Sequence, residues 1–275
     1  MSASLIDPMS SVATRQRPSG AVASDSDARA IVLIAERLEA RALGFERKRD
    51  ARCVFATAYA HLTRRLARRL NNSGFAEPSW VAELASAFAG YYFRAVDAFD
   101  SGALGPGAWK SVFDASRSGR TSVLEDLVLG LTAHIVNDLP RALCDVGLRD
   151  VTGRSRLDDY QRLNDVLGDA IERVQGAVTR RYDPLLGVLD LIAGSSDELL
   201  TNYGLRLGRA AAWYNAERLM DPELRGAADT AISRSPRLVL EGLIEPPFWS
   251  LRCVARGVRW VSHGLRRWPA RERRS

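Results

Sequence analysis

A histidine and an aspartate stand four residues apart in a segment that otherwise has the pattern of a buried helix. His134 and Asp138 lie within residues 124–145, where apolar residues recur every three or four positions. On a regular helix, Asp138 falls near the middle of the apolar stripe and His134 close to its edge. A carboxylate that faces an apolar interior is costly unless a cation, a metal ion or a hydrogen-bond donor meets it. The spacing therefore predicts a polar site inside the protein.

Two kinds of chemistry suit this pair. Side chains at i and i+4 converge on one point, so His134 and Asp138 could together bind one divalent metal ion. They could equally form an acid–base dyad, because imidazole exchanges protons near neutral pH. A structural role is the alternative: Asp138 stands just before Leu139 and Pro140 and could cap a new helix that has proline in its first turn. His134 would then donate to a backbone carbonyl.

A second set of polar and aromatic residues could complete the site. Arg206, Arg209 and Trp213 recur on one predicted helix, near the edge of its core face. Either arginine could form an ion pair with Asp138 or bind an anionic group of a substrate. The structural alternative is a peripheral salt bridge, with the tryptophan as core filler. The residues expected to contact a substrate are Tyr59, Tyr92, Asn164, Arg206, Arg209 and Trp213.

The elements that must position these residues are helices. Almost every segment has helical periodicity and no convincing alternating strand occurs, which predicts an all-α fold, a single compact multi-helix bundle. We expect a disordered leader at 1–26, a helical domain at 27–245 and a basic amphipathic tail at 246–275. Asp158 or Asp159 is expected to cap one helix, and Ser195 with Glu198 another. The predicted helices cover about 27–43, 54–70, 78–99, 109–113, 124–145, 158–178, 195–214 and 236–244.

The composition is that of a globular protein. The 275 residues are 46% hydrophobic and 26% charged, enough for a large domain with an ample core. No stretch approaches the roughly 18 apolar residues of a membrane span. The 3 cysteines are scattered and lack C-x-x-C spacing, which favours reduced thiols and a cytoplasmic location. Phosphate-binding glycine loops, nucleophile elbows and H-E-x-x-H motifs are also missing from the sequence, which disfavours P-loop, α/β-hydrolase and thermolysin-like chemistry.

The positive charge is concentrated at the C-terminal end. The net charge is +6, yet from residue 248 onward eight arginines face a single glutamate, so the rest of the chain is close to neutral. This distribution does not predict specific binding to nucleic acid. Apolar residues repeat between these arginines at helical spacing. Residues 248–275 are therefore expected to contact an anionic membrane surface or an acidic partner, unless their apolar face docks on the domain.

The motif around His134 resembles that of a known family. Residues 130–143 read GLTAHIVNDLPRAL and match G-x-x-A-H-I-x-x-D-L-P-x-A-L, the hallmark of the domain-of-unknown-function family 5995. The likeness spans about 28–220, and the tail lies outside it. It implies a helical domain with a shared polar site and supplies no reaction. Other residues that look family-like are Tyr59, Thr63, residues 88–93, Asp159, Tyr160, Asn164, Arg209 and Trp213.

Two further resemblances are local. The His134–Asp138 pattern is similar to a helix of zinc-dependent phospholipase C and P1-type nucleases, in which such a pair binds metal; with only 3 histidines this chain lacks the ligands for their trinuclear site. Residues 164–172 fit the second magnesium motif of class I terpene cyclases, N-D-x-x-(S/T/G)-x-x-x-E. Gly168 supplies no ligand there, Glu172 is expected to face solvent, and no aspartate-rich first motif precedes them. A cyclase that uses magnesium and a diphosphate substrate is therefore a further alternative.

The leading prediction is an enzyme that acts on a small, largely apolar metabolite, such as a secondary metabolite, in a pocket between helices. His134 would be the acid–base group or a metal ligand, and Asp138 would orient it or share the metal. The reaction would be hydrolysis, or an acid–base cyclisation or elimination. The alternative is a non-catalytic binding or scaffold protein, in which the pair fixes a kink and the tail recruits a partner.

Overall fold

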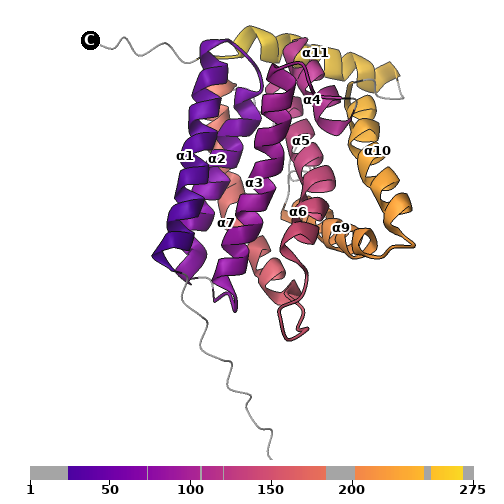
Figure 1. Ribbon diagram of the computed structural model, residues 1–275. Helices are drawn as coiled ribbons and strands as arrows, with labels where there is room; N and C mark the ends of the chain where they lie inside the picture. Colours follow the sequence, from indigo (N-terminus) through magenta and orange to yellow (C-terminus); the bar gives the residue numbers. More distant parts are fainter. Residues whose placement is uncertain are drawn as a thin grey trace, which may run out of the picture.

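The computed structural model describes residues 24–72, 74–105, 107–119, 121–183, 202–244 and 249–268. Within these ranges the chain is helical and contains no strand, so the predicted all-α fold is confirmed (Figure 1). Residues 1–23, which make up most of the predicted leader, lie outside the described residues. So do Ser195 and Glu198, the predicted capping box.

Three long helices lie side by side at the N-terminal end of the fold (Figure 1): α1 (Asp25–Arg47), α2 (Cys53–Arg69) and α3 (Pro78–Asp100). The first begins two residues earlier than predicted, because Ser24 and Asp27 form a capping box. The first half of α2 is buried on every side, from Cys53 to Ala60. Its alanines leave room for neighbouring helices to approach, and α2 therefore runs through the interior.

The segment that carries the motif is not one regular helix. After the short α4 (Ala108–Arg117), the chain forms α5 (Val123–Thr132), a π-helical turn (Ala133–Asp138) and α6 (Leu139–Val146). The amide of Leu139 donates to the carbonyl of His134, five residues back. Pro140 lacks an N–H and its ring would crowd the carbonyl four residues back, so a wider turn before it relieves the conflict. The prediction of a regular helix over 124–145 was wrong at this point.

The remaining helices are α7 (Leu157–Tyr182), α9 (Asn202–Met220), α10 (Arg225–Ile244) and α11 (Trp249–Leu265). Asp159 does not cap α7; its carboxylate accepts from the backbone amides of residues 76 and 77, each at 2.7 Å, and so fixes the start of α3. The prediction of a short helix near 236–244 was also wrong, because α10 begins at Arg225. Pro236 therefore lies inside this helix and does not mark its beginning.

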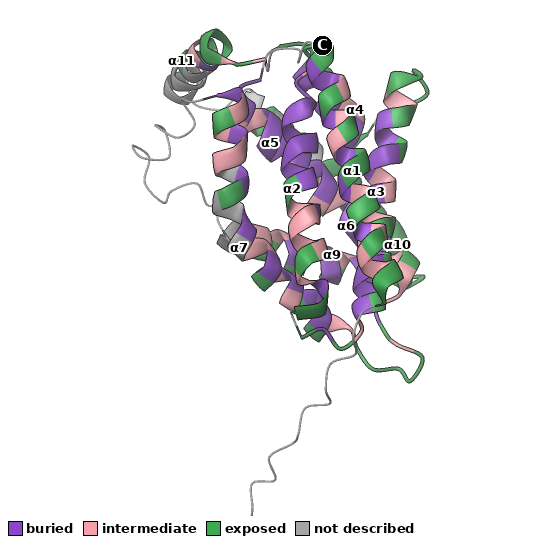
Figure 2. Ribbon diagram, turned by 90° about the vertical axis from the view of Figure 1, so that its left-hand side faces the viewer, coloured by how far each residue is buried: buried purple, intermediate pink, exposed green. Residues whose placement is uncertain are grey.

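Two apolar clusters make up the described core. One is built around Phe55, Tyr92 and Trp109, and the other around Trp80 and Trp213. The π-helical turn joins them, since the residue at its start belongs to the first cluster and the residue that follows it to the second. Buried residues gather on α2 and α5 in the interior (Figure 2). The polar pair of the motif therefore lies where the two cores meet.

The C-terminal helix α11 crosses one end of the bundle (Figure 1). Its Arg259 pairs with Glu125 at 2.7 Å. Arg266, which follows the helix and whose side chain is 7% exposed, pairs with Asp126. These contacts join the C-terminal segment to α5 through charges. Several side chains of its predicted apolar face, such as Leu251 and Val254, lie outside the described set. None of the helices in the described part of the chain is long and apolar enough to cross a membrane.

Candidate functional site

The carboxylate of Asp138 is the centre of a buried hydrogen-bond network. His134 is 3% and Asp138 1% exposed. Oδ2 of Asp138 lies 2.9 Å from Nδ1 of His134 and accepts from Nε1 of Trp109 at 2.8 Å. Its Oδ1 accepts from Nδ2 of Asn137 at 2.7 Å. Asp138 occupies the position before α6, but its side chain makes no capping hydrogen bond. The structural alternative of a helix cap was therefore wrong.

The network fixes which nitrogen of His134 carries the proton. An indole and an amide nitrogen donate to Asp138, which marks its carboxylate as an ionised acceptor. Nδ1 of His134 must then be the third donor. Burial lowers the pKa of His134, although the hydrogen bond and charge of Asp138 act in the opposite direction. The imidazole is therefore neutral near pH 7, and Nε2 carries a lone pair.

That second nitrogen has no hydrogen-bond partner. Nε2 of His134 is buried and unpartnered among the described groups. Leaving a buried polar atom unsatisfied costs about 1 to 3 kcal/mol. A ligand that donates an O–H, N–H or acidic C–H to Nε2 would remove this cost. The arrangement is an aspartate–histidine dyad with its basic atom unoccupied.

Aromatic rings hold the imidazole in place. Phe88 stacks on it, with ring centres 3.5 Å apart and planes 7° apart, and Tyr59 meets it edge-on at 4.6 Å. On the α2 side the site depends on Gly130, one turn before His134. A Cβ at this position would lie 2.5 Å from the ring of Phe55. Only glycine lets α5 approach α2 this closely, and the approach places the histidine among the rings.

The imidazole forms part of the wall of a cavity of about 100 Å³. The wall is almost entirely apolar, and the side chains come from α2, α3, the motif segment, α7 and α9. Its charged member is Arg209. The lining residues are Phe55, Tyr59, Leu62, Thr63, Leu66, Val81, Leu84, Ala85, Phe88, Leu131, His134, Ile135, Leu139, Leu163, Leu167, Leu205 and Arg209.

Arg209 is a buried cation without a carboxylate partner in the described part of the chain. It is 5% exposed, its Nε donates to Oδ1 of Asn164 at 2.8 Å, and its guanidinium lies 4.5 Å from the ring centre of Tyr160. Burial lowers its pKa, which reflects the cost of the desolvated charge. An anion in the cavity would offset that cost.

The structure brings together some of the predicted site residues and separates others. Tyr59 and Arg209 share the cavity with His134, and Asn164 holds Arg209 in place. Arg206 lies on the surface, where it pairs with Asp165 at 2.8 Å. The predicted ion pair between one of these arginines and Asp138 does not occur among the described contacts, where the arginines bind Asp165 and Asn164 of α7.

Two of the predicted aromatic contacts do not line the cavity. Trp213 packs on Tyr160 and donates to Glu217 at 3.0 Å. The ring of Tyr92 meets the imidazole edge-on, with ring centres 6.1 Å apart, and its hydroxyl is buried without a hydrogen-bond partner. Sequence reasoning missed Trp109, whose helical periodicity shows only that it is core. Asn137, the other donor to Asp138, was also not among the predicted site residues.

The donor set favours a hydrogen-bonded dyad over a metal site. Asp138 already accepts three hydrogen bonds, one of them from His134 itself. Within the described ranges, no group of three His, Cys, Asp or Glu side chains is arranged to hold a metal ion. In the terpene-cyclase-like segment, Asn164 and Asp165 both bind arginines. The side-chain oxygen of Asn164, the motif's first ligand, is therefore already engaged by Arg209.

Comparison with known proteins identifies a family of unknown function. Neither a curated protein nor a solved structure matches the chain significantly. A family model, described as a family of unknown function (DUF5995), matches residues 31–246, which include the dyad and Arg209 and exclude α11. Because the match covers most of the sequence, the chain belongs to the DUF5995 family.

Proposed function

We propose that the protein is an acid–base enzyme that acts on a compact, mainly apolar metabolite with a carboxylate group. The observation that carries this proposal is the buried, unpartnered Nε2 of His134, whose other nitrogen is held by Asp138. Arg209 would bind the carboxylate, and the apolar wall would hold the rest of the molecule. The cavity of about 100 Å³ is smaller than an engineered cavity of about 150 Å³ that holds benzene, so the ligand must be compact.

The dyad supports proton transfer in a defined direction. Nε2 of His134 would take a proton from the bound ligand, and the imidazolium would be stabilised by the carboxylate of Asp138. The same nitrogen would return the proton to the product. The apolar wall favours cyclisation or elimination over hydrolysis, because a hydrolytic site must hold and orient a water molecule. These proton transfers need no metal ion. We also propose a cytoplasmic location, which the free thiols of Cys53 and Cys144 support.

The ligand-binding half of this proposal can be tested with a matched series. Isothermal titration would compare 3-methylbutanoate with the corresponding alcohol and amine. The carboxylate should bind most tightly, and Arg209→Met should abolish its preference. Arg206→Met, on the same helix but at the surface, is the control and should bind like the wild type. Equal binding of acid and alcohol to the wild type would contradict the role of Arg209.

The catalytic half depends on the state of His134. Nitrogen NMR at neutral pH should show a proton on Nδ1 and none on Nε2. The protein should also speed exchange of the C3 protons of 4-methyl-2-oxopentanoate in heavy water, and His134→Gln should remove this effect while keeping a donor toward Asp138. A protonated Nε2 in the wild type would exclude the base.

A non-catalytic role remains the second candidate because the dyad lies in a π-helical turn. There, the bonds of Asp138 join that turn to Trp109 of α4 and could serve only to hold the irregular segment. This role predicts that His134→Gln lowers the unfolding free energy and leaves both ligand binding and proton exchange as in the wild type.

A further inference from the structure

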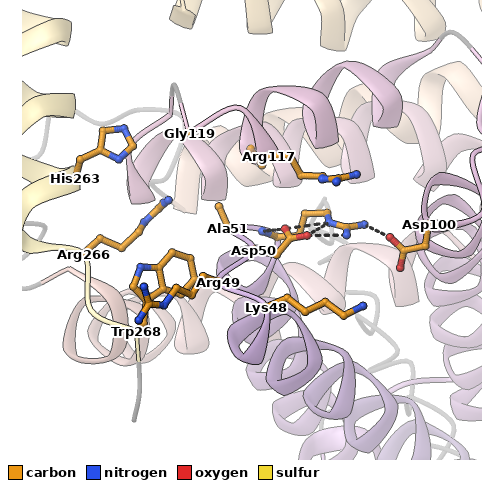
Figure 3. A pocket seen from close by; sticks show the side chains of 12 residues that line it. Lys48, Arg49, Asp50, Ala51, Asp100, Arg117, Gly119, His263, Arg266 and Trp268 are labelled. Carbon is orange, nitrogen blue, oxygen red and sulfur yellow. Dashed lines mark hydrogen bonds and ion pairs between the residues drawn. The ribbon is translucent and has the colours of Figure 1, made fainter. Parts of the chain in front are cut away.

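A second, larger cavity opens at the end of the bundle that α11 crosses. It has a volume of about 550 Å³. Its lining comes from the α1–α2 loop, the ends of α3 and α4, and the end of α11 with the chain that follows it (Figure 3). Most of its charged lining residues are basic. It is separate from the His134 cavity and shares no lining residue with it.

Part of the basic lining is structural. The side chain of Arg52 is 5% exposed and pairs with Asp50 at 2.7 Å and with Asp100 at 2.8 Å. All three side chains line the pocket, and their ion pairs form a row from Asp50 to Asp100 (Figure 3). Arg266 is likewise engaged by the buried Asp126. Their charges are neutralised within the protein, so they shape the pocket without adding much positive potential.

Three other cations in the lining have no carboxylate partner among the described residues. Lys48, Arg49 and Arg117 are exposed, and the guanidinium of Arg117 lies 5.5 Å from the ring centre of Phe99. Lys48 and Arg117 extend on either side of the row of ion pairs (Figure 3). Like charges that share one pocket repel each other unless an anion lies between them. The geometry therefore provides a place for a multiply charged anion.

The backbone of Arg49 supports a role for its side chain. It is the only non-glycine residue in the described ranges with a positive φ, 53°. Its amide donates to the carbonyl of Glu46, and that of Asp50 donates to Phe45, which is the usual way a helix ends at a left-handed residue. Glycine is favoured at this position, so the arginine there carries a cost in backbone free energy.

Trp268 adds an aromatic surface to the same pocket (Figure 3). The volume lies in the range of small-molecule sites. We propose that this pocket binds a phosphorylated small molecule, with its phosphate groups between Lys48, Arg49 and Arg117 and its organic part against Trp268. Phosphate fits the three cations because it offers several anionic oxygens to donors that approach from different directions.

The test uses the full chain at low salt. Titration calorimetry with pyrophosphate and with adenosine 5′-diphosphate should show binding, and the nucleotide should bind more tightly because of Trp268. Arg49→Gly should weaken both by about tenfold, the loss of one charge-assisted contact. Because glycine suits the backbone there, this variant should fold at least as well as the wild type. Arg154→Ala, in the α6–α7 loop at the opposite end of the bundle, is the control and should change nothing.

The phosphate could instead belong to a lipid headgroup, as expected for residues 248–275 at a membrane surface. Flotation with phosphatidylcholine vesicles, with and without phosphatidylglycerol, distinguishes the sources. Binding to the anionic vesicles that Arg49→Gly weakens, without binding of either soluble phosphate, would assign the pocket to a headgroup. A folded Arg49→Gly that binds every probe like the wild type would overturn the proposal, as would a wild type that binds none.

Discussion

Arginine is buried in two regions of this molecule under opposite conditions. Arg52, in the floor of the pocket at the bundle end, pairs with Asp50 and Asp100. Arg209, in the wall of the interior cavity, meets an amide, a backbone carbonyl and a ring, and no carboxylate of the described residues. When carboxylates pair with a buried arginine, their attraction offsets the cost of removing its charge from water, and no ligand is needed. A buried charge without a counterion costs free energy that only a ligand can return, and we therefore take it as a sign of function.

The largest expected effect compares these two arginines directly. Arg52→Met leaves Asp50 without its partner and should lower the free energy of unfolding by about 3 to 5 kcal/mol. Arg209→Met removes an uncompensated charge and should leave stability unchanged or raise it. Urea denaturation of both variants measures the difference. Equal losses would show that Arg209 is as structural as Arg52 and would remove the basis of the comparison.

Packing should be less tolerant beside the interior site than near the bundle end. Gly130→Ala places a Cβ 2.5 Å from the ring of Phe55 and should cost about 1 to 3 kcal/mol. Gly44→Ala, one turn before the α1–α2 loop, meets nothing closer than 4.0 Å and should gain about 0.5 to 1 kcal/mol, as usual for glycine in a helix. Thermal unfolding of the two variants gives the sign of each change. A neutral Gly130→Ala would mean that the ring can move aside.

The two regions should also respond to pH in opposite directions. Burial lowers the pKa of His134 below 6.5, so the unfolded chain takes up a proton first and stability is lost as pH falls through 6.5. Burial raises the pKa of Asp126 from 3.8 to about 6, despite Arg266, so the folded protein takes up a proton first and stability is gained as pH falls through that value.

Differences between variants isolate these contributions. Unfolding free energies should be measured from about pH 8 to about pH 5. As pH falls, the stability of His134→Gln should rise relative to that of the wild type. The stability of Asp126→Asn should fall relative to that of the wild type over the same range. Parallel curves for the three proteins would contradict both assignments.

The smallest effect expected is that of salt. The cations of the bundle-end pocket are exposed, so raising the ionic strength from about 0.01 M to about 0.1 M shortens the screening length from about 30 Å to about 10 Å and should weaken pyrophosphate binding several-fold. Binding of 3-methylbutanoate beside the buried Arg209 should change much less, because the interior is poorly screened. Titration at the two salt concentrations tests this, and equal sensitivity would indicate that the carboxylate binds at the surface.

Several features of the site could be predicted from single segments of sequence. The i, i+4 spacing of His134 and Asp138 places the two side chains together, and the hydrogen bond between them agrees with this expectation. The apolar stripe around them predicted their burial correctly. The π-helical turn could not be read from periodicity, because it depends on how the chain relieves the conflict at Pro140.

Contacts between distant segments were beyond the sequence. Trp109 reaches Asp138 across 29 residues, and nothing in its own helix distinguishes it from other core residues. Arg206 and Arg209 both lie near the edge of the core face of one helix, and the sequence does not distinguish between them. Only the rotation of α9 against its neighbours decides that the first pairs with Asp165 at the surface and the second enters the cavity.

The sequence by itself determined the all-α class, most helix positions and a buried histidine–aspartate pair, because periodicity, capping and spacing act over a few residues. Only the tertiary structure decided which nitrogen of His134 carries the proton and which arginine shares the cavity with it. It also decided that the end of the bundle holds a basic pocket. Those properties depend on hydrogen bonds and burial between segments far apart in the chain, and local patterns do not contain them.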